Sequence, residues 1–207
     1  MIGLEKKKRQ RRRAAIYWSA ASDEYKRHPI NLANPTIILE PVGRNTAPAI
    51  AAAAFQSLMQ SDKSILLILS TDHVIQDEEA FTKAVNDAIP LAESGKLVTF
   101  GVVAHEPNTG YGYIKKGESQ GPGFAVDAFV EKPSIEVAEE YLESGDYFWN
   151  SGMFLFKASR YLEELKKHRP DMYDSCQSSM KDISKDNDVL RVNKTIFDEC
   201  PSKSLDL

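Results

Sequence analysis

Short apolar runs alternate with amphipathic segments from residue 36 onward, and this alternation constrains the fold more than any other feature of the chain. The clearest run, residues 65–69, contains no polar residue, which is typical of a strand buried on both faces of a parallel sheet. Amphipathic segments between such runs indicate helices on both faces of that sheet. We therefore predict an α/β fold of three layers with a mostly parallel, mixed sheet. Residues 1–35 lack this periodicity and are predicted to form a separate, loop-like segment, followed by one domain at 36–207.

Capping residues locate the helices between these runs. Thr46 is predicted to cap a helix with Pro48 in its first turn, where the missing N–H group costs little. Two further helices are predicted between an N-terminal polar residue and a glycine that suits a helix end, at 77–95 and 134–145. The remaining predicted elements are strands at 36–39, 65–69, 97–103, 124–130 and 153–156, and helices at 159–168 and 170–182.

Polar turns lie beside the predicted strands. In open α/β sheets, ligands bind outside the carboxyl ends of the strands. Since several of these turns follow strand ends directly, we predict that they share one cleft. The turns are at residues 43–46, 70–73, 110–112, 131–133 and 150–152.

Charge is distributed unevenly along the chain. Residues 6–13 form a basic block, whereas the chain as a whole has a net charge of −4. We predict that this block is a solvated leader. Contact with nucleic acid is the alternative, but the block lacks the interleaved aromatic residues that stack on bases. Nucleic acid is therefore not a predicted partner.

Apolar runs and cysteines bear on where the protein resides. No apolar run approaches the roughly 18 residues that a membrane-spanning helix needs, and no signal peptide is visible. The two cysteines, Cys176 and Cys200, lack the spacing of metal ligands. We predict reduced thiols rather than a structural disulfide, and a cytoplasmic protein without a membrane partner.

Asp72 is a candidate metal ligand, because it follows the apolar run at 65–69. A carboxylate at the carboxyl end of a strand suits Mg²⁺, which prefers one or two carboxylates together with substrate phosphates. The alternative is an aspartate that caps the next turn, which is a common role. We assign no chemistry to the adjacent His73.

Residues 43–49 join a predicted strand to a predicted helix and are a candidate base-binding segment. A helix N-terminus offers free N–H groups, and small residues let a flat ring approach the backbone. The side chains of Arg44, Asn45 and Thr46 are predicted to read the edges of a base. A simple helix cap with a polar lead-in is an equally open alternative.

Two further segments are equipped to bind a phosphorylated sugar. Glu131 can accept hydrogen bonds from sugar hydroxyl groups, and Lys132 offers a point charge to a phosphate. A surface ion pair is the alternative for these two residues. Asn150 and Gly152 add an amide and a glycine where the backbone can approach a ligand. Trp149 is predicted to belong to the core.

Six motifs in a fixed order resemble those of the mannose-1-phosphate guanylyltransferases, a family of nucleotide-sugar pyrophosphorylases. The resemblance covers roughly residues 36–206 and implies a nucleotide-diphospho-sugar transferase fold, which is Rossmann-like. The motifs are EPVGRNTAPA at 40–49, LSTDHVI at 69–75, TGYGYI at 109–114, FVEKP at 129–133, WNSGMFLF at 149–156 and CPSKSLD at 200–206.

The resemblance implies an enzyme that makes GDP-mannose and pyrophosphate from GTP and mannose 1-phosphate, with Mg²⁺ as cofactor. By motif, Asp72 and Asp206 would hold the metal, and Asp72 and Lys132 would be the catalytic residues. Lys132 would bind the sugar phosphate. The guanine pocket would comprise Arg44, Asn45, Thr46, Pro48 and Ala49, and the mannose site Gly112, Glu131, Asn150 and Gly152.

One part of the family pattern is missing from these residues. The family has an early glycine-rich loop, of the form Gly-Gly-x-Gly-x-Arg-Leu-x-Pro-Leu, that cradles the triphosphate, and residues 1–35 contain no such sequence. We therefore expect this chain to be impaired or inactive and truncated at both ends. The alternatives are a non-catalytic binding protein for sugar phosphates or nucleotide sugars, a gene fragment, or a nucleic-acid binder. Oligomeric state stays open, with a homo-oligomer among the options.

Overall fold

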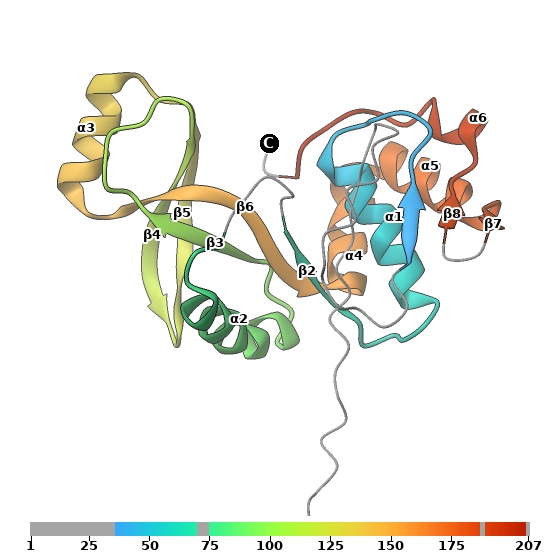
Figure 1. Cartoon of the computed structure of the whole chain (residues 1–207), viewed down its shortest axis with the longest axis horizontal. Coiled ribbons are helices and arrows are strands. Elements are labelled where there is room, and N and C mark those ends of the chain that lie inside the picture. Colours follow the sequence, from blue (N-terminus) through green and yellow to red (C-terminus); the bar gives the residue numbers. More distant parts are fainter. Residues whose placement is uncertain (1–35, 70–74, 187–188, 206–207) are drawn as a thin grey trace, which may run out of the picture.

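The computed structural model describes residues 36–69, 75–186 and 189–205. Its centre is β6 (Tyr147–Lys157), a long strand that crosses the molecule (Figure 1). One edge of β6 pairs with β3 (Val98–Val103), and the other edge pairs with β2 (Ile65–Ile68) and β4 (Gly112–Gln120). A hairpin joins β4 to β5 (Gly123–Glu131), which completes a five-stranded sheet.

The predicted α/β class is confirmed, whereas the strand directions differ from the prediction. Every pairing in the five-stranded sheet is antiparallel among the described residues. The parallel pair is found in a smaller sheet, between β1 (Ile37–Leu39) and β8 (Val189–Arg191), with β7 (Ser184–Asp186) at its edge. An apolar run predicts that a strand is buried on both faces, but it does not predict whether the strand is parallel or antiparallel to its neighbours. In β2, Leu66 and Leu67 are indeed buried in two different cores.

Helices cover the sheet on different sides and create these cores. The largest core lies between β6 and the group α1 (Thr46–Leu58), α4 (Ala158–His168) and α5 (Pro170–Lys181). In α1, the side chains of Ala51–Ala54 are at most 1% exposed, and their small size allows the neighbouring helices to pack closely. The remaining helices are α2 (Glu78–Glu93), which packs on β6, α3 (Ile135–Ser144), which packs near β4, and the short α6 (Lys194–Phe197).

Capping agrees with the sequence at four of five places, including Gly95, which follows the end of α2 with a φ of 93°. Asp77 and Ser134 each accept a hydrogen bond from the third residue of their helix, and Gly145 ends α3 with a φ of 67°. At α1 the cap is Asn45, one residue before the predicted Thr46, and its Oδ1 accepts from the N–H of Thr46 at 2.8 Å.

One of the predicted polar turns lies inside a strand, and two lie at strand ends. The predicted turn at 150–152 lies inside β6, because pairing with β3 and β4 extends that strand to residue 147. Gly112 begins β4 and Glu131 ends β5, so both lie at strand ends as predicted.

The predicted segment 1–35 lies outside the described residues. No described helix has both the length and the apolar character that crossing a bilayer requires.

Replacing Asp77 with alanine is expected to lower the free energy of unfolding by about 1 kcal/mol. The carboxylate accepts a 2.8 Å hydrogen bond from the N–H of Ala80, and this donor has no partner within the helix after the change. Urea unfolding followed by circular dichroism measures the loss. Thr82→Ala, an exposed change on the same helix, is the control. Equal stability of Asp77→Ala and the unmodified chain would contradict this role.

Candidate functional site

Three residues of the predicted sugar site meet where β4, β5 and β6 run side by side (Figure 1). Gly112 of β4 lies opposite Glu131 of β5, and the β4–β6 register places Asn150 beside Gly112. A Cβ atom on Gly112 would lie 2.8 Å from Oε2 of Glu131 and 3.5 Å from Cβ of Asn150. A side chain at this position would move the Glu131 carboxylate, which is the free end of a half-exposed side chain, so glycine leaves that carboxylate in its place beside Asn150.

Lys132 lies next to this group, at the end of β5. Its backbone has a φ of 44°, a conformation that non-glycine residues seldom adopt and that often occurs at functional sites. Its Nζ atom is 3.4 Å from Oε1 of Glu131, and the two side chains are 63% and 49% exposed. An ion pair this exposed adds little stability. The ammonium group is thus accessible to an anionic ligand at the same place as a hydrogen-bond acceptor.

The backbone of β6 is irregular where the site residues lie. Oδ1 of Asn150 accepts a hydrogen bond from the N–H of Gly152 at 3.1 Å, and Gly152 has a φ of 64°. The register with β3 shifts between Thr99 and Gly101, opposite this segment. The Ser151 hydroxyl donates to the carbonyl of Phe100 and accepts from the N–H of Met153. Gly152 therefore shapes the strand and helps to orient Asn150.

The predicted base-binding segment is held by the last described part of the chain. We call residues 198–205 the C-terminal strap. The Arg44 guanidinium donates to the carbonyl of Asp198, the N–H of Ala47 donates to the carbonyl of Lys203 at 3.1 Å, and Oγ1 of Thr46 accepts from the N–H of Leu205 at 3.0 Å. The first turn of α1 is thus fastened to the strap by backbone and side-chain bonds.

A buried tyrosine of α4 also binds the first turn of α1. The Tyr161 hydroxyl of α4 donates to the carbonyl of Ala47 at 2.8 Å, and the residue is only 3% exposed. Burial raises the pKa of this hydroxyl, so it stays protonated as a donor. No local pattern in the sequence points to this contact, because 114 residues separate the two partners.

The predicted nucleotide residues differ in their accessibility. Asn45 and Thr46 are exposed and Ala49 is half-buried, whereas Pro48 belongs to the fully buried set and packs in the core. Arg44 turns toward the strap, and within the described part of the chain its buried Nε has no hydrogen-bond partner. Their roles toward a base stay predictions, with the exposed Asn45 and Thr46 best placed for contact.

Both predicted metal ligands, Asp72 and Asp206, lie outside the described residues. Within residues 36–69, 75–186 and 189–205, no group of three or more histidine, cysteine, aspartate or glutamate side chains is arranged to hold a metal ion. The magnesium prediction therefore depends on segments about which the structure says nothing.

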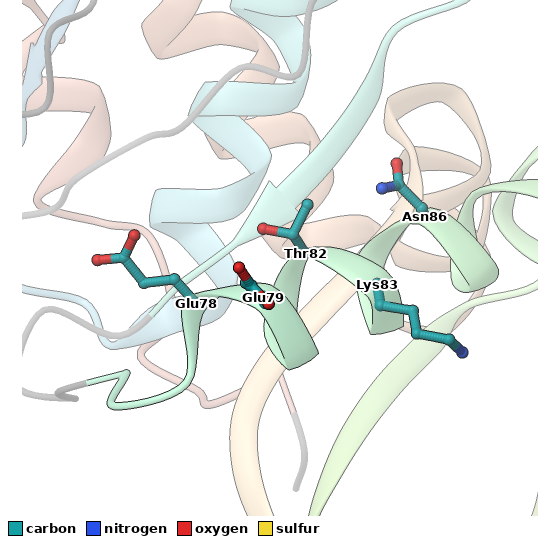
Figure 2. Close-up of a pocket in the computed structure, with 5 residues that line it drawn as sticks. All are labelled: Glu78, Glu79, Thr82, Lys83 and Asn86. Atoms are coloured by element: carbon teal, nitrogen blue, oxygen red, sulfur yellow. The ribbon is translucent and has the colours of Figure 1, made fainter.

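A shallow hollow elsewhere in the molecule takes its lining from α2 alone (Figure 2). Its side chains are exposed, and one of them, Lys83, already pairs with Asp87 at 2.7 Å. No predicted site residue belongs to it, so we do not assign it to the candidate site. The lining residues are Glu78, Glu79, Thr82, Lys83 and Asn86.

The antiparallel sheet with helices packed on its sides, and the polar groups gathered at its neighbouring strands, define an α/β protein with a candidate ligand site. A family model described as nucleotidyl transferase matches residues 9–195, and the chain belongs to this family.

Its relatives agree with the resemblance in the sequence. The chain is 53% identical over 184 residues to mannose-1-phosphate guanylyltransferase of Escherichia coli (strain K12), covering 86% of this chain and 38% of that protein. It is 56% identical over 178 residues to mannose-1-phosphate guanylyltransferase RfbM of Salmonella typhimurium, covering 84% of this chain and 37% of that protein. The chain thus spans less than two fifths of the length of these curated relatives.

Solved structures support the same fold. A protein described as mannose-6-phosphate isomerase from Helicobacter pylori superposes with a TM-score of 0.73 at 36% identity, covering 86% of this chain and 69% of that one. A protein described as mannose-1-phosphate geranyltransferase from Thermus thermophilus gives a TM-score of 0.72 at 31% identity, covering 82% of this chain and 48% of that one. The predicted family and its fold are confirmed.

Proposed function

We propose that this chain is part of an enzyme that forms GDP-mannose and pyrophosphate from GTP and mannose 1-phosphate. The observation that carries the proposal is the meeting of Gly112, Glu131, Asn150 and Lys132 at three neighbouring strands, in a chain whose relatives are named mannose-1-phosphate guanylyltransferases. Hydrogen-bond acceptors for sugar hydroxyl groups and a cation for the phosphate are what the acceptor substrate requires.

The reaction needs positioning more than covalent chemistry. An oxygen of the sugar phosphate attacks the α-phosphorus of GTP in line, the new P–O bond forms, and the bond to the departing pyrophosphate breaks. Glu131 and Asn150 would orient mannose, and Lys132 would hold the attacking phosphate beside them. A lysine at this position also reduces the repulsion between two anionic substrates. The exposed Asn45 and Thr46 would contact guanine.

The proposal includes Mg²⁺, held by Asp72 and Asp206. When bound, the ion would neutralise charge on the phosphates. It also includes a cytoplasmic location, supported by the two unpaired thiols, which a reducing compartment favours. GTP and mannose 1-phosphate are the proposed small-molecule partners.

Turnover by these 207 residues alone is expected to be weak or absent. The residues contain no glycine-rich phosphate loop, and the loss of a single donor to a transition-state charge costs about 3–4 kcal/mol. A coupled pyrophosphate-release assay with GTP, mannose 1-phosphate and MgCl₂ measures this, and the Escherichia coli relative is the positive control. Turnover equal to that control would contradict the expected impairment.

Binding measurements separate a site for mannose 1-phosphate or GDP-mannose from a nucleic-acid binding surface. Calorimetry with mannose 1-phosphate and with GDP-mannose is expected to show binding, and glucose 1-phosphate is the specificity control. Binding without turnover is the result expected for an impaired enzyme and for a binding protein. No binding of either ligand would remove the sugar-site proposal for this chain. Nucleic-acid affinity that falls steeply with salt and vanishes without residues 1–13 would favour a nucleic-acid binder instead.

A further inference from the structure

Two thiols meet beneath the candidate base-binding segment. Cys176 of α5 and Cys200 of the C-terminal strap are both buried, at 0% and 1% exposure, and their Sγ atoms are 3.7 Å apart. They are the two cysteines of the chain, and neither is in a disulfide. Twenty-four positions separate them in the sequence, so tertiary packing brings them together.

The pair lies at a junction between the strap, α5 and α1. Sγ of Cys176 is 3.9 Å from the carbonyl of Pro48 in the first turn of α1. Cys200 lies two residues after Asp198, whose carbonyl accepts a hydrogen bond from Arg44. A covalent bond between the two sulfur atoms would therefore tie the strap to α5 directly behind the segment that the strap holds.

The two sulfur atoms are also chemically unequal. A hydrogen bond from Cys176 lowers the pKa of Cys200, and the positive charge of Arg44 acts in the same direction. The same hydrogen bond, together with burial, raises the pKa of Cys176. Both thiols are buried, and the lowered pKa of Cys200 makes it the sulfur of the pair that more readily forms a thiolate.

We propose that Cys176 and Cys200 form a reversible disulfide site that, when oxidised by a small peroxide, locks the C-terminal strap and the first turn of α1 onto α5. A disulfide requires the sulfur atoms to approach to about 2.05 Å, which is a side-chain-scale movement from their present contact. In the reduced protein the contact is non-covalent, and the strap is held by hydrogen bonds and by the packing of Cys200 and Leu205 in the largest core.

The oxidation balances with peroxide as the oxidant. The Cys200 thiolate attacks one peroxide oxygen, the O–O bond breaks and hydroxide leaves, which produces a sulfenic acid. The sulfur of Cys176 then attacks the Cys200 sulfur and loses its proton, the S–O bond breaks, and water leaves. The pair loses two electrons and the peroxide gains them. A thiol reductant reverses the step by exchange.

Intact-mass analysis of the folded chain tests the proposal. The protein is treated with hydrogen peroxide, unfolded in the presence of a maleimide and weighed. We expect a species about 2 Da lighter than the reduced chain, carrying no maleimide, that forms before sulfinic acid accumulates and disappears with dithiothreitol. Retention of both thiols under conditions that oxidise the urea-unfolded chain would overturn the proposal. So would sulfinic acid at either cysteine without the lighter species.

Thermal unfolding and hydrogen exchange test the locking of the strap. Oxidation is expected to raise the thermal midpoint by on the order of 5 °C, since the bond closes a loop in the unfolded chain. It is also expected to slow exchange of the Ala47 amide, which donates to the strap. Unchanged exchange at Ala47 would overturn the link to the base-binding segment.

Two variants test whether the mass change and the thermal shift come from a bond between Cys176 and Cys200. Cys176→Ala is expected to lose both the lighter species and the thermal shift. Ser179→Ala, a buried change on the same helix that leaves both thiols in place, is expected to keep them. A thermal shift that persists in Cys176→Ala would show that peroxide acts elsewhere and would overturn the proposal. The mass measurement on the unmodified chain decides the matter even if a variant fails to fold.

Discussion

Replacing Lys132 with alanine is expected to weaken the binding of mannose 1-phosphate by about tenfold to a hundredfold. The reason is that the ammonium group lies 3.4 Å from the Glu131 carboxylate, so its removal leaves a negative charge facing an anionic ligand. Calorimetric titration of the folded variant measures the loss. Lys132→Arg, which keeps the charge but changes its geometry, is expected to lose less affinity than Lys132→Ala.

Lys115 supplies a matched control for this experiment. It lies on β4 of the same hairpin and pairs with Asp127 at 3.2 Å, which is also an exposed ion pair. Lys115→Ala is expected to leave the affinity unchanged, because Lys115 alternates to the opposite face of β4 from Gly112. An equal loss in both variants would mean that overall charge, and not a site at Lys132, attracts the ligand. An unchanged affinity in Lys132→Ala would remove this residue from the proposed site.

Replacing Phe156 with alanine is expected to lower the free energy of unfolding by about 3–5 kcal/mol. The side chain is 1% exposed in the largest core, where its ring stacks on Tyr161 with 5.2 Å between centroids. Deletion removes apolar contacts and leaves a cavity between β6 and the helices. This loss is a large part of the stability of a typical domain, so the variant is expected to unfold at clearly lower urea concentration.

Phe124 provides the comparison for the core prediction. It lies on β5 and is 57% exposed, so its replacement by alanine is expected to change the free energy of unfolding by about 0.5 kcal/mol or less. Both variants are measured by urea unfolding with extrapolation to water. Similar losses at Phe124 and Phe156 would contradict the description of the core.

Sequence signals predicted those features that depend on interactions between residues close together in the chain. The caps at Asp77 and Ser134 were predicted because a short polar side chain satisfies N–H groups two or three residues away. An apolar run has no polar face to expose, which predicted burial on both faces at 65–69; Leu66 and Leu67 are buried, and the other residues of the run are partly buried. The family was also readable from six short motifs, and its relatives confirm it.

Strand direction required the tertiary structure. The run at 65–69 was assigned to a mostly parallel sheet, but β2 and β3 each pair with β6 in the antiparallel direction. The same burial pattern arises in either direction when helices cover both faces of a sheet. Residues 150–152 were assigned to a turn because they are polar, whereas pairing on both edges extends β6 through them.

Residue types and their order along the chain were enough to identify the candidate chemistry, namely the acceptor Glu131, the cation Lys132 and the small Gly112. Which of these residues touch depends on the tertiary structure, because strand register places Gly112 against Glu131 and beside Asn150. The contacts of the strap with α1, and the meeting of Cys176 with Cys200, likewise depend on it. Helix capping and the pattern of apolar residues depend on neighbours along the chain. Strand register and the packing of the core depend on residues that are far apart in the sequence.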